Sequence, residues 1–407
     1  MHTFAPAEAV AQEDIRRARA LHVHRFFFRL ALGAGNVFAW VFVFRGFYLA
    51  NGNLEATLAG VAILYALSQV IAFILTPLAG AALRHGIRRA LAYGTLASVF
   101  AFACMTLVFA PNMSNTSAFW MIGSFVVLSG IHRALYWIPY KTAAADIHSL
   151  RSPFALAREA AIAFMPLLAG LTIETVSQGP AVLLAAVSGL IILALFPLAM
   201  LPESYERFEW HYTETFKELL SPFNRQPLVL AILDGIQGVT LLLIWPLAAF
   251  IILGQTFAAL GVILSATLCL GFLGRSLLRA ILRRLRSDRS TSVLAALAFS
   301  SWIFRLPVGS PIQIFVADAY YHSGVSPRRF SIDAFAFDQW ADGGHFVDEY
   351  TALKEMGMMM GRFLACALVV FLALNMNATI AFASAIILAA VASAASVFLS
   401  RRLARTV

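Results

Sequence analysis

The stretch PLAGAALRHGIRRAL, residues 77–91, is a short basic loop between two long apolar runs. The run before it covers about residues 55–83, and the run after it covers about residues 89–110. Each run is long enough to cross a hydrocarbon core of about 30 Å as a helix. Two such runs joined by a tight turn with three arginines are typical of membrane-spanning helices connected at a cytoplasmic surface.

The composition extends this prediction to the whole chain. Hydrophobic residues make up 60 % of the 407 residues and charged residues only 13 %, which is too little polar surface for a water-soluble globule. Backbone groups in lipid must be satisfied within each segment, so we expect helices. The formal net charge of +9 falls in short clusters between apolar runs, and it therefore indicates membrane topology rather than binding to nucleic acid.

Twelve apolar runs divide the chain into two groups of six. The first six lie at about residues 26–50, 55–83, 89–110, 118–140, 153–176 and 181–201. The second six lie at about residues 227–253, 258–281, 292–305, 309–326, 351–374 and 378–400. We therefore expect an all-α integral membrane protein with two six-helix bundles, residues 26–201 and 227–400. A cytoplasmic interfacial segment (residues 1–25), a connector (residues 202–226) and a short tail (residues 401–407) complete the predicted organisation.

Basic residues follow every second run. Lys and Arg precede the first run and follow the second, fourth, sixth, eighth, tenth and twelfth. The loops on the other side, such as NGN at residues 51–53 and PNMSNTS at residues 111–117, contain neither. Because cytoplasmic loops are enriched in Lys and Arg, we expect both termini in the cytoplasm and the protein in the cell membrane, inner or plasma.

Residues 292–326 leave about 17 residues for each of two crossings, which is the lower limit for a spanning helix. Both flanks of this segment are basic, so its number of crossings is even. The stretch WIFRLPVGSP, residues 302–311, supplies a turn. We expect two short or broken helices here, and a re-entrant hairpin is the alternative.

Two groups of six spans with both ends inside resemble the major facilitator superfamily of secondary transporters. In that family the loop after the second span carries a Gly, an Asp, a second Gly and two basic residues. The glycines and basic residues of this pattern match Gly80, Gly86, Arg88 and Arg89, whereas the Asp is missing. The resemblance covers the chain from about residue 26 to its end and implies a transporter that needs no cofactor.

Two further stretches are similar to family motifs. Arg133, in the fourth span, stands where the family often carries an Arg. The fifth span reads AAIAFMPLLAG at residues 160–170, which resembles an antiporter pattern and keeps Pro166 and Gly170. This second resemblance implies export, and close packing of small residues beside a proline is the alternative explanation.

Polar residues within the spans are the candidate site residues, because an ionisable group in hydrocarbon needs a partner or a water-filled cavity. The candidates for binding the substrate or a coupling ion are Asn36, His132, Arg133, Asp234, Gln237, Asp318 and Arg362.

Several of these candidates have two interpretations. We expect Asp318 to pair with Arg362, and Arg133 to pair with Glu159 across two neighbouring helices as a structural or gating ion pair. Arg133 facing the transport cavity is the alternative. The pKa range of His132 suits proton coupling, but a hydrogen bond at a helix interface would explain it equally.

The loop at residues 331–355 concentrates Asp, Glu and His, but its spacing is irregular for metal ligands. We interpret it as a solvated linker and predict no metal site.

The leading functional hypothesis is a secondary active transporter of a small solute that works by alternating access in the lipid bilayer, coupled to protons or Na⁺. A carboxylate such as Asp234 or Asp318 would carry the coupling. The chain has no Gly-x-x-x-x-Gly-Lys-Ser/Thr segment, so ATP-driven pumping by this chain is not expected. The alternatives are a transport-inactive receptor or assembly partner, or a membrane-embedded enzyme acting on lipids; we predict that it is not an enzyme.

Overall fold

The computed structural model describes residues 7–145, 155–206, 208–284, 287–324 and 347–406, and all regular elements in these ranges are helices. Nine helices of this described part are long and apolar enough to cross a membrane. Two shorter apolar helices cover Phe257–Gly271 and Ser292–Ile303. The predicted all-α membrane fold is confirmed.

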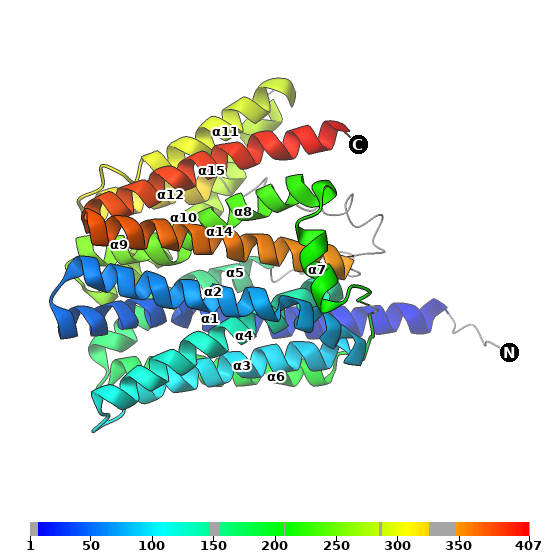
Figure 1. Ribbon diagram of the computed structural model, residues 1–407, viewed down its shortest axis with the longest axis horizontal. Helices are drawn as coiled ribbons and strands as arrows, with labels where there is room; N and C mark the ends of the chain where they lie inside the picture. The colour runs from blue at the N-terminus through cyan, green and yellow to red at the C-terminus, as the bar shows by residue number, and fades with distance from the viewer. Residues whose placement is uncertain (1–6, 146–154, 207, 285–286, 325–346, 407) are drawn as a thin grey trace.

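The first six helices form one group, in the lower half of Figure 1. They are α1 (Ala7–Asn51), α2 (Leu54–Ala82), α3 (Ile87–Val108), α4 (Asn115–Ala145), α5 (Ala155–Thr175) and α6 (Gly179–Ala199). Within the group α3 packs against α4 and α6, α1 packs against α5 and α6, and α2 packs against α4. α1 is continuous from Ala7, so most of the segment that we assigned to residues 1–25 extends the first span.

The second group follows the amphipathic helix α7 (Tyr212–Leu219) and occupies the upper half of Figure 1. It contains α8 (Arg225–Val239), α9 (Trp245–Ile252), α10 (Phe257–Arg284), α11 (Ser287–Ile303), α12 (Pro311–Gly324), α14 (Val347–Asn375) and α15 (Ala378–Thr406). One π-helical turn, η3 (Thr240–Ile244), joins α8 to α9 and widens the helix there. The predicted short helices of residues 292–326 are α11 and α12.

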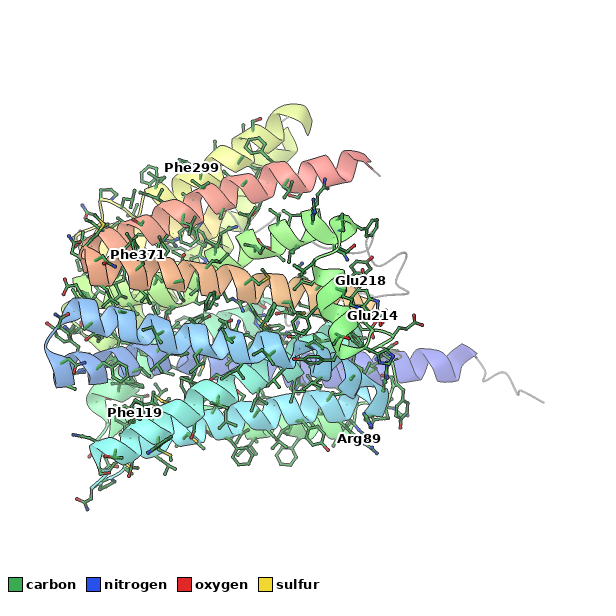
Figure 2. All side chains as sticks on the ribbon, viewed as in Figure 1. Arg89, Phe119, Glu214, Glu218, Phe299 and Phe371 are labelled. Carbon is green, nitrogen blue, oxygen red and sulfur yellow. The ribbon has the colours of Figure 1, made fainter. Side chains whose placement is uncertain are left out.

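The first turn of α1 and the last turn of α15 lie at the same end of the bundle as α7 (Figure 1). This basic end carries the loop of residues 83–86 and the connector of residues 200–211, and the opposite end carries the loops that lack Lys and Arg. Figure 2 shows Arg89, Glu214 and Glu218 near the basic end. The shared end for the termini agrees with the predicted topology, whose orientation across the membrane stays a prediction.

The sides of the bundle present apolar side chains to the surroundings. Phe119, Phe299 and Phe371 are examples, and Figure 2 shows them on three different helices. Phe119 is 59 % exposed and Phe371 is 62 % exposed, which is unfavourable in water and favourable in hydrocarbon. The chain is therefore a multi-pass membrane protein.

Two helix pairs join the groups: α2 packs against α14, and α5 packs against α10. A Cβ atom on Gly261 of α10 would collide with the carbonyl oxygen of Pro166, so glycine permits this close approach of the two backbones. The backbone amide of Leu167 donates to the Ser265 hydroxyl across the same contact, at 2.8 Å. The small-residue and proline pattern of residues 160–170 thus serves the contact between the groups.

We expect Gly261→Ala to lower the stability of the protein, by about 1–3 kcal/mol, because the added methyl group forces α5 and α10 apart. Gly189→Ala on α6 is the matched control, because a Cβ atom there meets no atom within 4 Å. The control should be neutral or slightly stabilising. Thermal unfolding of the detergent-solubilised variants checks both, and equal midpoints for the two variants would contradict the close contact.

Candidate functional site

A polar cluster lies where α2 meets α4 and α14. Arg362 of α14 donates from Nη1 to Oε1 of Gln69 on α2, at 3.3 Å. The amide nitrogen of Gln69 donates to the Ser68 hydroxyl at 2.9 Å, which orients the amide oxygen toward Arg362. One turn away on α2, the Tyr65 hydroxyl lies beside the guanidinium of Arg133 from α4. We call Tyr65, Gln69, Arg133 and Arg362 the central cluster.

The two arginines of the central cluster lie at the same depth in the bundle. Lys141 of α4 and Glu355 of α14 form an ion pair near the basic end, with 2.6 Å between Nζ and Oε1. The chain directions of α4 and α14 are opposite, and Arg133 and Arg362 each lie about two helical turns beyond this pair. One group of helices thus supplies one guanidinium, and the other group supplies the second.

The structure places His132 away from the central cluster. Its Nδ1 atom lies 2.8 Å from the carbonyl oxygen of Gly94 on α3. Its ring packs against Phe28 and Tyr136, with centroid separations of 5.4 and 5.1 Å. Of the two interpretations of this histidine, the structure favours the hydrogen bond at a helix interface.

The predicted ion pair between Arg133 and Glu159 is wrong. Glu159 of α5 pairs with Arg29 of α1, with 2.8 Å between its Oε2 atom and Nη2 of Arg29. The physical reason is helix order, because α5 packs against α1, whereas Arg133 of α4 points to α2. The linear sequence gave no information about which helix lies beside α5.

The predicted pair between Asp318 and Arg362 is also wrong. Oδ1 of Asp318 accepts hydrogen bonds from Nε and Nη2 of Arg305, at 3.0 and 2.7 Å. Both side chains are buried, and aromatic rings surround the guanidinium: those of Trp245, Trp302 and Tyr321. Our sequence reasoning missed Arg305 as a partner, although an arginine in the apolar stretch of residues 302–311 was visible. This pair joins the turn after α11 to α12.

We expect Arg305→Met to destabilise the protein by about 3–5 kcal/mol, because it leaves the Asp318 carboxylate buried without its cation. The double variant Arg305→Met, Asp318→Leu removes both charges and should recover much of that loss. The thermal unfolding midpoint and the folded yield in detergent measure the difference. A double variant no more stable than Arg305→Met would contradict a purely structural ion pair.

The remaining candidates occupy separate positions. Gln237 of α8 donates to the Ser396 hydroxyl of α15 at 3.1 Å, so it faces its own group of helices. Asp234 is half-buried on α8, one turn before Gly238, and the position of a Cβ atom on Gly238 is 3.6 Å from Nε of Arg362. Asn36 is half-buried midway along α1.

The loop between α2 and α3 obtains a carboxylate from elsewhere in the chain. Glu203, just after α6, pairs with Arg88 at 3.0 Å and approaches Arg89 at 3.9 Å. Gly86 has a φ of 115° and lies against the same carboxylate, where a Cβ atom would collide. Glu203 therefore supplies the negative charge that the loop motif of Gly80, Gly86, Arg88 and Arg89 lacks.

Separate contacts join the two groups at each end of the bundle. At the basic end, besides the Lys141 and Glu355 pair, Oε1 of Glu349 on α14 accepts from the backbone amide of Glu209 at 2.8 Å. At the opposite end, Oε1 of Glu174 on α5 accepts from the backbone amide of Ala258, at 2.9 Å, in the first turn of α10. Neither set of contacts shares a residue with the central cluster.

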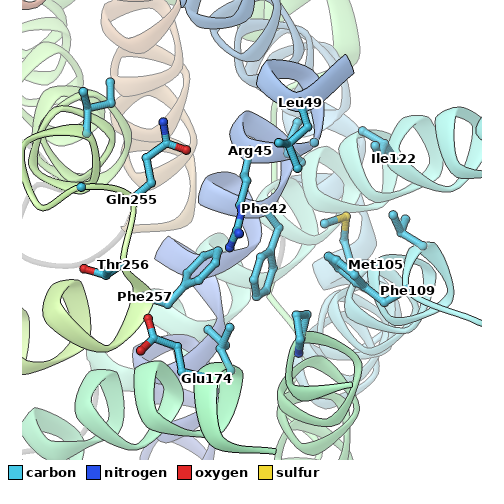
Figure 3. A pocket seen from close by; sticks show the side chains of 17 residues that line it. Phe42, Arg45, Leu49, Met105, Phe109, Ile122, Glu174, Gln255, Thr256 and Phe257 are labelled. Atoms are coloured by element: carbon cyan, nitrogen blue, oxygen red, sulfur yellow. The ribbon is translucent and has the colours of Figure 1, made fainter. Parts of the chain in front are cut away.

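A pocket of about 870 Å³ opens at the opposite end of the bundle (Figure 3). Its lining is mostly apolar and comes from α1, α3, α4, α5 and α6 and from residues 251–257, which run from the end of α9 to the start of α10. Figure 3 shows the ring of Phe257 between the side chains of Arg45 and Glu174. The guanidinium of Arg45 lies 5.1 Å from the centre of this ring, and Phe257 also packs against Phe38 and Phe42.

Metal ligands are not grouped in the described part of the chain, where no three His, Cys, Asp or Glu side chains are placed to hold an ion. Most of the acidic loop of residues 331–355 lies outside the described residues.

Solved structures of transporters share this architecture. A peptide transporter covers 95 % of this chain and 94 % of its own, with 13 % identity and a TM-score of 0.59. A D-xylose–proton symporter covers 93 % and 96 %, with 14 % identity and a TM-score of 0.60. A nucleoside transporter covers 95 % and 99 %, with 12 % identity and a TM-score of 0.62.

No family model and no curated protein matches the sequence. At 12–14 % identity these likenesses show a shared fold, that of the three transporter structures, and this fold agrees with the one that the sequence resemblance implied. The three similar structures are transporters and not enzymes.

Proposed function

We propose that this protein is a secondary active transporter that moves a small solute by alternating access. The observation that carries the proposal is the position of the central cluster. It lies between helices of both groups, and different contacts join the groups at the basic end and at the opposite end. A site in that position is reached from one side when one set of contacts opens and from the other side when the second set opens.

The moving bodies in this proposal are the predicted bundles, residues 26–201 and 227–400. The basic end faces the cytoplasm of the host, and the protein resides in the cell membrane. A solute shifts the protein from the open states toward the closed arrangement only if it binds the closed arrangement more tightly. Contacts with both groups provide such a difference, because they are complete only when the groups lie close together.

The coupling ion in this proposal is a proton or Na⁺, and Asp234 is the better candidate to bind it. Asp318 is held by Arg305 in a buried, hydrogen-bonded ion pair, so its charge serves the packing of α12. Asp234 is half-buried on α8 near the π-helical turn, and α8 packs against α14, which carries Arg362. Export is the direction that the resemblance of the α5 pattern to an antiporter motif implies, and the same residues also form the contact between α5 and α10.

The alternative hypothesis, that the protein is a transport-inactive receptor, has less support once Glu203 is considered than it had from the sequence alone. The missing Asp of the α2–α3 loop was the argument for it, and Glu203 restores a carboxylate beside the loop arginines. A carboxylate therefore lies beside the loop arginines, supplied by the segment after α6 instead of by the loop itself.

We expect spin labels at the two ends of the bundle to report opposite movements. One pair is placed at the exposed residues His85 and Phe223 of the basic end, and the other at Ser177 and Met376 of the opposite end. Lys141→Gln removes the ion pair with Glu355, so it should lengthen the first distance and shorten the second. Pulsed electron paramagnetic resonance in lipid nanodiscs measures both distances.

The labelled proteins carry Cys104→Ala and Cys269→Ala, whereas the buried Cys366 is retained. Glu174→Gln is the reciprocal variant, because it weakens the contact with the α10 amide and should produce the reverse change. Distances that stay constant, or that lengthen together at both ends, would contradict alternating access.

A further inference from the structure

We propose that Arg133 and Arg362 together bind the anionic group of the transported solute, which is therefore a small organic anion such as a carboxylate or a phosphate ester. This inference rests on the proposed function and adds a substrate class to it.

The first argument is the unmet hydrogen-bonding capacity of Arg362. Its side chain belongs to a residue that is only 9 % exposed, and its Nη1 atom donates to a neutral amide oxygen. Its Nε atom is buried and has no partner among the described residues. The Tyr65 hydroxyl, beside Arg133, is buried and has no hydrogen bond of normal geometry. Donors without acceptors therefore gather on this face of α2.

The second argument is charge. The ion pairs of the described residues join neither Arg133 nor Arg362 to a carboxylate, whereas they do neutralise Arg29, Lys141 and Arg305. Two guanidinium groups contact α2 one turn apart, at Tyr65 and Gln69, so they repel one another in a medium of low polarity. An anion between them removes this repulsion, and the planar guanidinium fork matches the oxygens of a carboxylate or phosphate.

The third argument concerns the surfaces beside the arginines. Gly238 of α8 has no side chain next to the Arg362 guanidinium, and the π-helical turn begins two residues later. Turns of this kind are frequent at functional sites. On the other side, the Trp40 ring packs against Tyr65 and Phe125, with centroid separations of 5.0 and 5.3 Å. Polar donors beside aromatic rings suit a ligand in which an anionic group is attached to a small hydrocarbon skeleton.

The position of the two arginines also links binding to movement. Arg133 belongs to the first group of helices and Arg362 to the second, so an anion that contacts both holds the groups together. Such a ligand binds the closed arrangement more tightly than either open one, which is the differential binding that alternating access requires.

The test is the thermal unfolding midpoint of the full-length protein in detergent, at constant ionic strength, with matched probes. The probes are butyrate, butyramide and butylamine; benzoate, benzamide and benzylamine; and glucose 6-phosphate with glucose. We expect anionic members to raise the midpoint and their neutral and cationic counterparts to leave it unchanged, because only the anions pair with both guanidinium groups.

The variants Arg133→Gln and Arg362→Gln should each weaken the apparent affinity for the stabilising anion at least tenfold. Arg362→Lys keeps the positive charge but lacks the planar pair of donors of the guanidinium. Weaker anion binding by this variant, with its unfolding midpoint without ligand preserved, separates loss of binding from loss of folding. Arg45→Gln is the matched control, because this arginine lines the pocket at the opposite end. Its response to the anion should equal that of the unaltered protein.

Three results would overturn the inference: stabilisation by the amides or amines, stabilisation by anions that both glutamine variants retain, or no response to any anion. The comparison of the two carboxylates with glucose 6-phosphate shows whether the site binds a carboxylate or a phosphate ester. The spin-label distances need no added solute, so opposite movements at the two ends with a negative probe panel would leave alternating access standing and remove only the anion site.

Discussion

Hydrocarbon provides no partner for a polar group, and this constraint determines how the charged residues of the chain are arranged. Arg305 meets Asp318, Arg29 meets Glu159 and Lys141 meets Glu355, in each case through side chains of different helices or of a helix and its adjoining turn. These pairs lower the free-energy cost of placing the cations within or beside the membrane. Against that background Arg362 is unusual, because its partner in the described structure is the neutral Gln69.

The two groups of helices meet through backbone contact on one side and side-chain contact on the other. α5 and α10 approach closely because Gly261 has no side chain, whereas α2 and α14 are joined by longer polar and apolar side chains. Small residues allow van der Waals contact that is strong without charge, which is how membrane helices associate. The ends of the bundle are joined by a few polar contacts, and in the proposed transport cycle the two sets break and re-form separately.

The positions of many helices could be predicted because an apolar run of sufficient length has few alternatives in a membrane. The pairing of charges could not be predicted in the same way. Glu159 meets Arg29 and not Arg133 because α5 packs against α1, and no property of residues 153–176 indicates that neighbour. Glu203 is a similar case, since its role depends on the connector folding back over the α2–α3 loop.

By itself the sequence determined that this is a helical membrane protein, that its basic loops gather on one side, and that it resembles a large class of transporters. Those features follow from local length, polarity and charge, which each segment carries wherever it lies. Only the tertiary structure decided that Arg133 and Arg362 share one face of α2 while Asp318 is bound by Arg305. The reason is that contacts between different segments, whether 13 positions apart as for Arg305 and Asp318 or 293 as for Gln69 and Arg362, depend on helix order and rotation, which emerge from the packing of the whole bundle.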